Sequence, residues 1–272
     1  MKKIYPFKLG KFECMVVSDG EAFVPANMLF ANAPGDILKQ RLSDYNLKPE
    51  KIFGPLNCLV VNTRDHSVLI DTGLGHLAKL IPNGKKGGKL LRNLKAAGIK
   101  PEDIDTVIVT HYHSDHIGGI SDKKGKPTFP GAKYFFMRSE WDFAVDQHEM
   151  IKAKLLTIQD QVEFLEEDAE IIPGIKAMAA PGHTPGHMML SIYSEEKEML
   201  YISDVIGHTL HIEFPDWCMS HEYDPKQAIR TRRTILEKSV KEKILIHAFH
   251  QDFPGLGYVV QGENGWTWQS VE

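Results

Sequence analysis

Four residues with metal-binding side chains lie within six positions near the middle of the chain. Residues 107–120 read VIVTHYHSDHIGGI and contain His111, His113, Asp115 and His116. Imidazole and carboxylate together suit zinc, manganese, iron or cobalt. Alternate residues of an extended chain point the same way, so His111 and His113 could bind one ion, and a turn would direct Asp115 and His116 toward a second. A histidine-rich surface loop is the alternative, but a strand of the buried type directly precedes these residues.

Short apolar runs with β-branched residues recur along the chain and predict strands that are covered on both faces. These runs lie at residues 57–62, 67–71, 105–110, 132–137, 187–193, 199–203 and 243–247. The third run ends immediately before His111. Since α/β folds place their active groups in loops at strand ends, this position favours a functional site.

Helical patterns lie between some of these runs. They cover residues 36–45, 90–97, 140–167 as one or two helices, and 224–240. In the last of these, Asp224 can cap the helix, Pro225 suits its first turn, and Gln227 can close a capping box. Strands and helices alternate without a low-complexity linker, so we expect one α/β domain over residues 1–272. Residues 24–56 carry an apolar patch at 28–30 and could form a flap, a dimer contact or ordinary packing.

Composition excludes several classes of protein. The chain has 272 residues, of which 42% are hydrophobic and 25% charged, as in ordinary globular proteins. A net charge of −4 argues against a general nucleic-acid binder. The three cysteines form no C-x-x-C pair, and no apolar run is long enough to span a membrane. We therefore expect a cytoplasmic protein that binds neither membrane nor nucleic acid.

The pattern His111-x-His113-x-Asp115-His116 resembles the H-x-H-x-D-H signature of the metallo-β-lactamase superfamily. Four other segments match that superfamily in the expected order, so the resemblance covers roughly residues 55–260. The segments are Asp71-Thr72-Gly73, the run PGHTPGH at 181–187, Ser203-Asp204, and His250 with the following Phe253-Pro254-Gly255. The resemblance implies an α/β fold, a four-layer αβ/βα sandwich with mixed sheets.

The same resemblance implies a site for two divalent metal ions, with zinc expected and manganese, iron or cobalt as alternatives. One ion would be bound by His111, His113 and His183, and the other by Asp115, His116 and His250. Asp204 would bridge the two ions. Asp71 would either hold a ligand in place or serve only as a turn residue.

The ending His250-x-x-Phe-Pro-Gly-x-Gly is similar to the methyl-parathion-hydrolase-like branch, which includes N-acyl-homoserine lactonases. The resemblance therefore implies a lactonase that uses a metal-bridging hydroxide on a small-molecule substrate. The chain could also form a homodimer through residues 24–56. Asp115 or Asp204 would move a proton, and His208 would reach the substrate. Alternatives are a phosphotriesterase or arylesterase, an iron-dependent oxidoreductase with the same ligands, or a metal-stabilised binding module.

One position departs from the pattern of many lactonases in this superfamily. They carry a tyrosine three residues after the bridging aspartate, whereas this chain has Gly207. His208 or Tyr223 would then have to replace that tyrosine. Of the other histidines, we expect His187 to form structural hydrogen bonds and His221 to lie on the surface.

Overall fold

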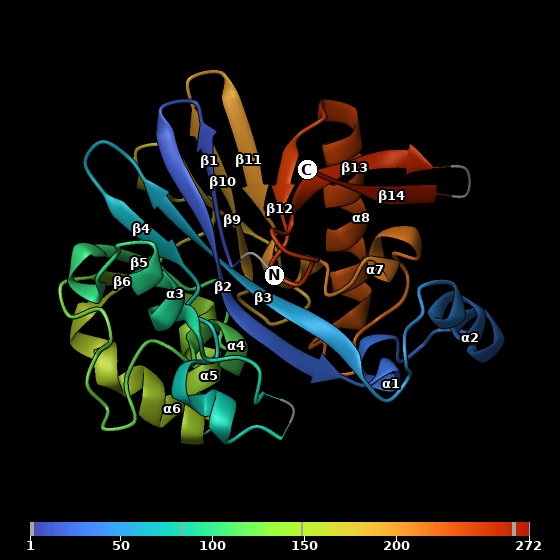
Figure 1. The fold of residues 1–272 in the computed structure, drawn as a ribbon, viewed down its shortest axis with the longest axis horizontal. Helices are drawn as coiled ribbons and strands as arrows, with labels where there is room; N and C mark the ends of the chain where they lie inside the picture. Colours follow the sequence, from blue (N-terminus) through green and yellow to red (C-terminus); the bar gives the residue numbers. More distant parts are fainter. Residues whose placement is uncertain (1–2, 83, 148, 263–264, 272) are drawn as a thin grey trace.

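Two mixed β-sheets form the centre of the computed structural model, which describes residues 3–82, 84–147, 149–262 and 265–271. Each sheet has seven strands (Figure 1). The first sheet contains, in spatial order, β1 (Ile4–Leu9), β2 (Phe12–Val24), β3 (Ile52–Asn62), β4 (Ser67–Ile70), β5 (Thr106–Ile108), β6 (Lys133–Met137) and β7 (Val162–Leu165). The second contains β8 (Glu170–Ile172), β9 (Ile175–Ala179), β10 (Met188–Ser194), β11 (Lys197–Tyr201), β12 (Leu245–His247), β13 (Leu256–Gly262) and β14 (Gly265–Ser270).

Several helices lie on the outer faces of these sheets, as the predicted four-layer sandwich requires. The α-helices are α1 (Ala26–Leu29), α2 (Gly35–Asp44), α3 (Leu90–Ala96), α4 (Ser114–Ile117), α5 (Arg138–Gln147), α6 (Glu149–Leu155), α7 (Leu210–Glu213) and α8 (Pro225–Glu242). Short 3-10 helices are η1 (Gly75–Lys79), η2 (Pro101–Asp103), η3 (Leu156–Gln161) and η4 (Ser203–Val205). Helices α3, α5 and α6 pack on the first sheet, and α7 and α8 pack on the second.

Strand direction follows the connections. Strands β4 to β7 run parallel to one another because helical segments connect them, whereas β1 to β4 are joined antiparallel. In the second sheet only β11 and β12 are parallel, and the long helix α8 lies between them in sequence. The carboxyl ends of β5, β11 and β12 are therefore free to present loops to one site.

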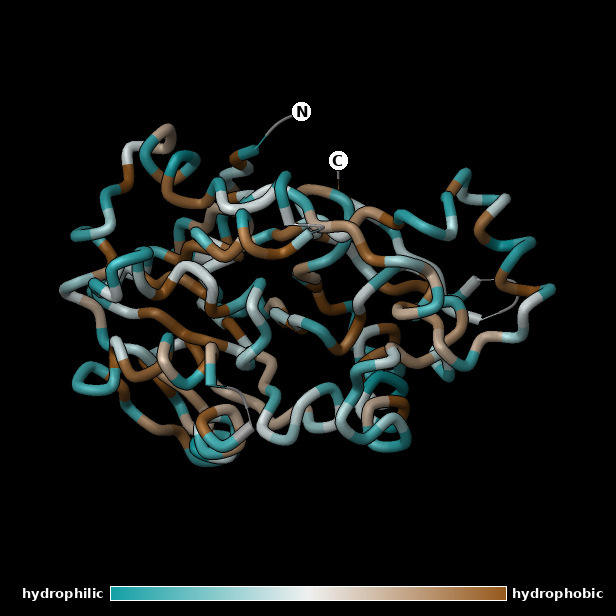
Figure 2. The backbone as a smooth tube through the Cα atoms, turned by 90° about the horizontal axis from the view of Figure 1, so that it is seen from below, coloured by the Kyte–Doolittle hydropathy of each residue, from teal (hydrophilic) through white to brown (hydrophobic). Residues whose placement is uncertain are grey.

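The main core lies between the two sheets and under α3, α5 and α6. It contains fully buried residues of both sheets, such as Val60 and Leu69 from the first and Leu190 and Met199 from the second. Figure 2 shows hydrophobic segments running through the middle of the molecule and hydrophilic segments at its periphery. Among the described residues, no helix is both long and apolar enough to cross a membrane.

Two details differ from the sequence predictions. Residues 162–165 belong to the segment predicted as helical but form β7, because they pair with β6 and complete the first sheet. Asp224 caps α8 by accepting the Gln227 N–H at 3.0 Å, as predicted. The Gln227 side chain does not close a capping box; its amide contacts Thr231 and Arg230 instead.

Candidate metal centre

The seven side chains predicted as metal ligands meet where the loops at the ends of several strands converge. Four of them follow β5: His111, His113, Asp115 and His116. His113 directly precedes the short helix α4, and Asp115 and His116 lie within it. The others come from the second half of the chain. His183 precedes β10, Asp204 lies in η4 directly after β11, and His250 follows β12.

The first group consists of His111, His113, His183 and Asp204, whose donor atoms all lie within 4.8 Å of one another. The Nδ1 atom of His113 is 3.0 Å from His111 Nε2 and 2.9 Å from His183 Nε2. Asp204 Oδ2 is 3.3 Å from His183 Nε2 and 3.7 Å from His111 Nε2. Three imidazoles thus present one nitrogen each to a common point beside one carboxylate oxygen.

The second group consists of Asp115, His116 and His250. The other oxygen of Asp204, Oδ1, is 3.1 Å from His116 Nε2 and 3.3 Å from His250 Nε2. Asp115 Oδ2 is 3.5 Å from His250 Nε2 and 3.9 Å from His116 Nε2. The carboxylate of Asp204 therefore contacts one histidine group through each oxygen.

Hydrogen bonding alone accounts poorly for this arrangement. A neutral imidazole carries one N–H, yet the Nδ1 atom of His113 lies at hydrogen-bond distance from two other ring nitrogens. His116 Nε2 and Asp204 Oδ1 are buried and lack a hydrogen bond of good geometry among the described residues. Imidazole nitrogens and carboxylate oxygens are the donors that first-row divalent metals prefer. The residues present fit two divalent metal ions.

Neighbouring groups fix the orientation of several donors. His116 Nδ1 donates to Asp71 Oδ2 at 2.9 Å, which fixes the ring so that its Nε2 faces the cluster. His250 Nδ1 donates to the Pro55 carbonyl at 2.9 Å in the same way. His187 donates from Nδ1 to the Ala180 carbonyl at 3.1 Å and accepts the Asp204 backbone N–H at 3.3 Å. It thus forms the structural hydrogen bonds expected for it.

Electrostatics act differently on the two groups of donors. Burial opposes charge on Asp204, but the surrounding histidines outweigh it and hold the pKa of Asp204 well below its usual range. Burial, together with neighbouring histidines, lowers the pKa values of His111 and His113 well below 6.5. Those two rings are neutral at pH 7, with a lone pair free for a ligand. In the second group, burial opposes charge on His116 and His250, but Asp204 and the neighbouring carboxylates outweigh it and raise the pKa values of both rings above 6.5, so metal binding there displaces protons.

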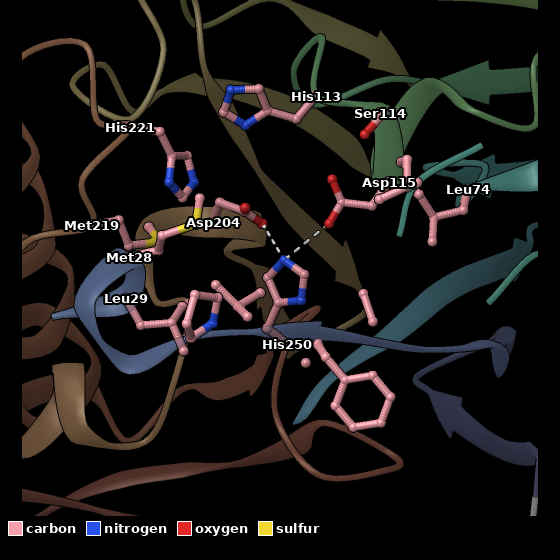
Figure 3. Close-up of a pocket in the computed structure, with 17 residues that line it drawn as sticks. Met28, Leu29, Leu74, His113, Ser114, Asp115, Asp204, Met219, His221 and His250 are labelled. Atoms are coloured by element: carbon pink, nitrogen blue, oxygen red, sulfur yellow. Dashed lines mark ion pairs between the residues drawn. The ribbon is translucent and has the colours of Figure 1, made fainter. Parts of the chain in front are cut away.

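A cavity of about 320 Å³ opens beside the cluster. Its polar side is formed by His113, Asp115, Asp204 and His250 (Figure 3). The rest of the lining is mainly apolar. It comes from the end of β2, from α1 and the residue before it, from the residues on either side of η1 and from the segment after α7: Phe23, Val24, Pro25, Met28, Leu29, Leu74, Ile81 and Met219. An apolar cavity with a few polar groups at one end suits a small molecule that has an apolar part and a reactive polar part.

Many lactonases carry a tyrosine where this chain has Gly207, and the two residues predicted to replace it, His208 and Tyr223, lie in different surroundings. A side chain at Gly207 would meet Met219, since its Cβ would lie 2.8 Å from Met219 Sδ. Tyr223 is 62% exposed and packs on Phe143. His208 is not among the described residues that line the cavity; its Nδ1 accepts the Leu210 N–H at 3.1 Å. Burial lowers the pKa of His208 to about 4, as it does for His221, so both rings are neutral and they differ in position: among the described residues His221 lines the cavity and His208 does not.

His221 lines the cavity, although the sequence suggested only a surface position. Its ring lies beside that of His113 (Figure 3), with the two ring centroids 5.4 Å apart. The centroid of the His183 ring is 5.3 Å from that of His221. The residue is exposed, but its ring faces the metal-binding cluster. No spacing signal marks His221 in the sequence, because the segment that carries it folds back onto the site.

Comparison with known proteins identifies the class. The sequence profile of the metallo-beta-lactamase superfamily matches residues 52–245, and the chain belongs to this superfamily.

Relatives and solved structures narrow the comparison. The chain is 26% identical over 219 residues to an N-acyl homoserine lactonase of Bacillus thuringiensis, covering 75% of this chain and 84% of that protein. It is similar to the solved structure of AidC, a dizinc quorum-quenching lactonase in complex with a product, with a TM-score of 0.90, 27% identity and coverage of 99% and 97% of the two chains. The hydrolase AbOPH gives a TM-score of 0.91 at 26% identity, covering 100% of this chain and 98% of that one.

Proposed function

We propose that this metal-dependent hydrolase opens N-acyl-homoserine lactones and that its two ions are zinc. The observation that carries the proposal is the division of seven donors into two groups on either side of Asp204, at the polar end of an apolar cavity. The lactonase relatives support the lactone, and the dizinc neighbour supports zinc. These matches do not favour the phosphotriesterase, arylesterase or iron oxidoreductase alternatives.

His111, His113 and His183 would hold the first ion, and Asp115, His116 and His250 the second, with Asp204 between them. When bound, two divalent ions lower the pKa of a water so that it attacks at neutral pH, and they polarise the scissile carbonyl. The apolar wall at Met28 and Leu29 would hold the acyl chain, which directs the lactone ring toward the donors. This favours a substrate-binding role for the apolar patch at residues 28–30.

Asp115 is better placed than Asp204 to carry a proton to the leaving alkoxide oxygen. Both oxygens of Asp204 contact two histidines, and its side chain is only 5% exposed. The Asp115 side chain is 24% exposed, lines the cavity and contacts its nearest histidines at 3.5 and 3.9 Å. A carboxylate with freedom to move between water and substrate can accept a proton and release it.

His221 would take the place of the missing tyrosine by donating a hydrogen bond to the substrate. We expect His221→Ala to lower kcat/KM by about tenfold, because a single hydrogen bond contributes up to about 1.5 kcal/mol and about 1.4 kcal/mol corresponds to a factor of ten. His208→Ala is the matched control, since His208 lies outside the cavity lining, and we expect it to change kcat/KM less than threefold. An equal loss in both variants would contradict the assignment of His221.

A pH-stat assay on N-hexanoyl-homoserine lactone tests the proposal, with the metal content measured on the same sample. We expect proton release that is lost with metal removal and regained with two zinc ions per chain. A two-zinc protein that opens no acyl-homoserine lactone would refute the lactonase assignment. One iron per chain with oxygen uptake would refute the hydrolase itself.

The proposal also covers the cellular compartment, the domain organisation and the oligomeric state. All three cysteines are free and buried, and burial raises the pKa of Cys14 to about 12. Reduced, unreactive thiols support a reducing compartment such as the cytoplasm. We further propose that residues 1–272 form one domain and that the chain assembles as a homodimer, with residues 24–56 as the contact to test by sedimentation.

A further inference from the structure

Glu140 is a buried carboxylate that contacts both loops carrying donors of the first metal group. It lies in the first turn of α5, and none of its surface is exposed. Its Oε1 accepts the Tyr112 backbone N–H at 2.9 Å. Its Oε2 accepts the Thr184 hydroxyl at 2.8 Å and the Gly186 backbone N–H at 2.9 Å.

These three donors stand next to the metal-binding histidines. Tyr112 lies between His111 and His113 in the loop after β5, and Thr184 directly follows His183 in the loop before β10. One loop leaves the first sheet and the other enters the second. A single side chain from a third element therefore joins the two halves of the first metal group.

The backbone of the loop before β10 also approaches Glu140 closely. A Cβ at Gly186 would lie 2.3 Å from the Glu140 backbone nitrogen, so only glycine allows the loop to approach so closely. Among the described residues Glu140 forms no ion pair, and its three partners are neutral groups. Burying a carboxylate with neutral partners is costly, and burial raises the pKa of Glu140 to about 7 despite these hydrogen bonds. A well-packed apolar residue would avoid that cost but could not join the loops.

We infer that Glu140 is a positioning residue for the first metal ion: it holds the loops of His113 and His183 together so that their ring nitrogens converge before the ion binds. The inference rests on the proposed metal-dependent function, but it concerns assembly of the site rather than the reaction. A ligand set that is already ordered loses less conformational entropy on binding than a set that must be gathered.

The test measures zinc binding to metal-free protein without substrate, by competition with a chromophoric chelator. In Glu140→Gln the side chain keeps its size, but an NH2 group faces the hydrogen-bond donors. We expect one of the two zinc dissociation constants to rise about 10–100-fold, as for other residues that orient metal ligands, while the other changes less than about threefold. The cobalt-substituted variant should also show an altered visible spectrum, which a general loss of stability would not produce.

Two further variants keep the inference falsifiable. Asp142→Asn changes an exposed carboxylate of the same helix and should leave both dissociation constants unchanged. Thr184→Val removes only one of the three hydrogen bonds and should weaken the same zinc site by a smaller factor, about 3–10-fold. If Glu140→Gln folds and binds both ions as tightly as the parent protein, the inference is wrong. If that variant does not fold, unchanged zinc binding in Thr184→Val overturns it.

The outcome is independent of the lactonase assignment. Selective loss of one zinc in a protein that opens no lactone would support the role of Glu140 and refute the proposed substrate. Full lactonase activity with unchanged zinc binding in Glu140→Gln would support the proposed substrate and refute the role of Glu140.

Discussion

Replacing Asp71 by asparagine should separate metal-site support from turn formation, the two roles that the sequence leaves open for this residue. Asp71 has a φ of +58°, a left-handed conformation that Asp and Asn tolerate better than most residues. Its side chain is fully buried. Asp71→Asn therefore keeps the shape and the turn and changes only the charge and one acceptor.

The hydrogen bonds of Asp71 set the size of the effect. Oδ2 accepts from the Thr110 hydroxyl, His116 Nδ1 and the Tyr201 hydroxyl, each at 2.9 Å, and Oδ1 accepts the Thr110 N–H at 2.9 Å. In asparagine, an NH2 group must face donors at one of these positions, so one or two bonds are lost. Each hydrogen bond to a charged group contributes about 1.5–3 kcal/mol, so Asp71→Asn should lower the free energy of unfolding of the metal-free protein by about 1.5–6 kcal/mol.

The same change should weaken metal binding. His116 Nδ1 would lose a charged acceptor that fixes the ring, and loss of such support lowers metal affinity about 10–100-fold. Guanidinium unfolding of the metal-free protein and zinc competition measure the two effects separately. Tyr201→Phe removes a single bond to Asp71 and should cost about 1–3 kcal/mol. If Asp71→Asn matches the parent protein within 1 kcal/mol and binds zinc equally well, Asp71 serves only the turn and our reasoning fails.

Three other predictions follow from the site and the core. Asp204→Asn should lower lactone turnover by more than about 100-fold and reduce the bound zinc, because Asp204 contacts both groups of histidines; full turnover in steady-state kinetics would exclude the bridging role. His247 is fully buried, and burial lowers its pKa to about 3 in the folded protein. As the pH falls below 6.5, His247 is therefore protonated in the unfolded chain but stays neutral in the folded protein. Protonation of the unfolded chain lowers the free energy of unfolding by up to about 1.4 kcal/mol for each pH unit below 6.5. In urea unfolding between pH 4 and 7, the free energy of unfolding should therefore fall less steeply with falling pH for His247→Phe than for the parent protein. Met28→Trp should fill part of the cavity and lower kcat/KM for decanoyl-homoserine lactone about tenfold more than for the butanoyl compound; an equal effect on both would place the acyl chain elsewhere.

The fold could be predicted only in part: no predicted strand corresponds to β1, β2, β8, β9, β13 or β14, and the residues of β7 are predicted as helical. Strands that are buried on both faces, such as β3 and β10, stand out as continuous apolar runs. Strands β1 and β14 lie at sheet edges and are only partly buried, so their sequences mix polar and apolar residues. Their pairing with a neighbouring strand defines them more than their own composition does.

The candidate site, like the fold, could be predicted only in part from the sequence. The seven predicted metal ligands lie in short, recognisable segments, and the structure places them in two adjoining groups. Glu140 and His221 gave no such signal. Glu140 lies 28 positions after Tyr112 and 44 before Thr184, and only the packing of α5 brings the three residues together. Contacts between distant segments carry no local spacing, so a single sequence cannot reveal them.

Each metal group draws its donors from both halves of the chain. His111 and His113 follow a strand of the first sheet, whereas His183 and Asp204 belong to the second half; Asp115 and His116 are likewise completed by His250. The link between the sheets, at residues 166–168, is exposed. Two fragments cut there would each keep a complete sheet but an incomplete set of donors for either ion. Zinc would then act as the cross-link between them, and the cut enzyme should work as a split protein whose reassembly depends on metal.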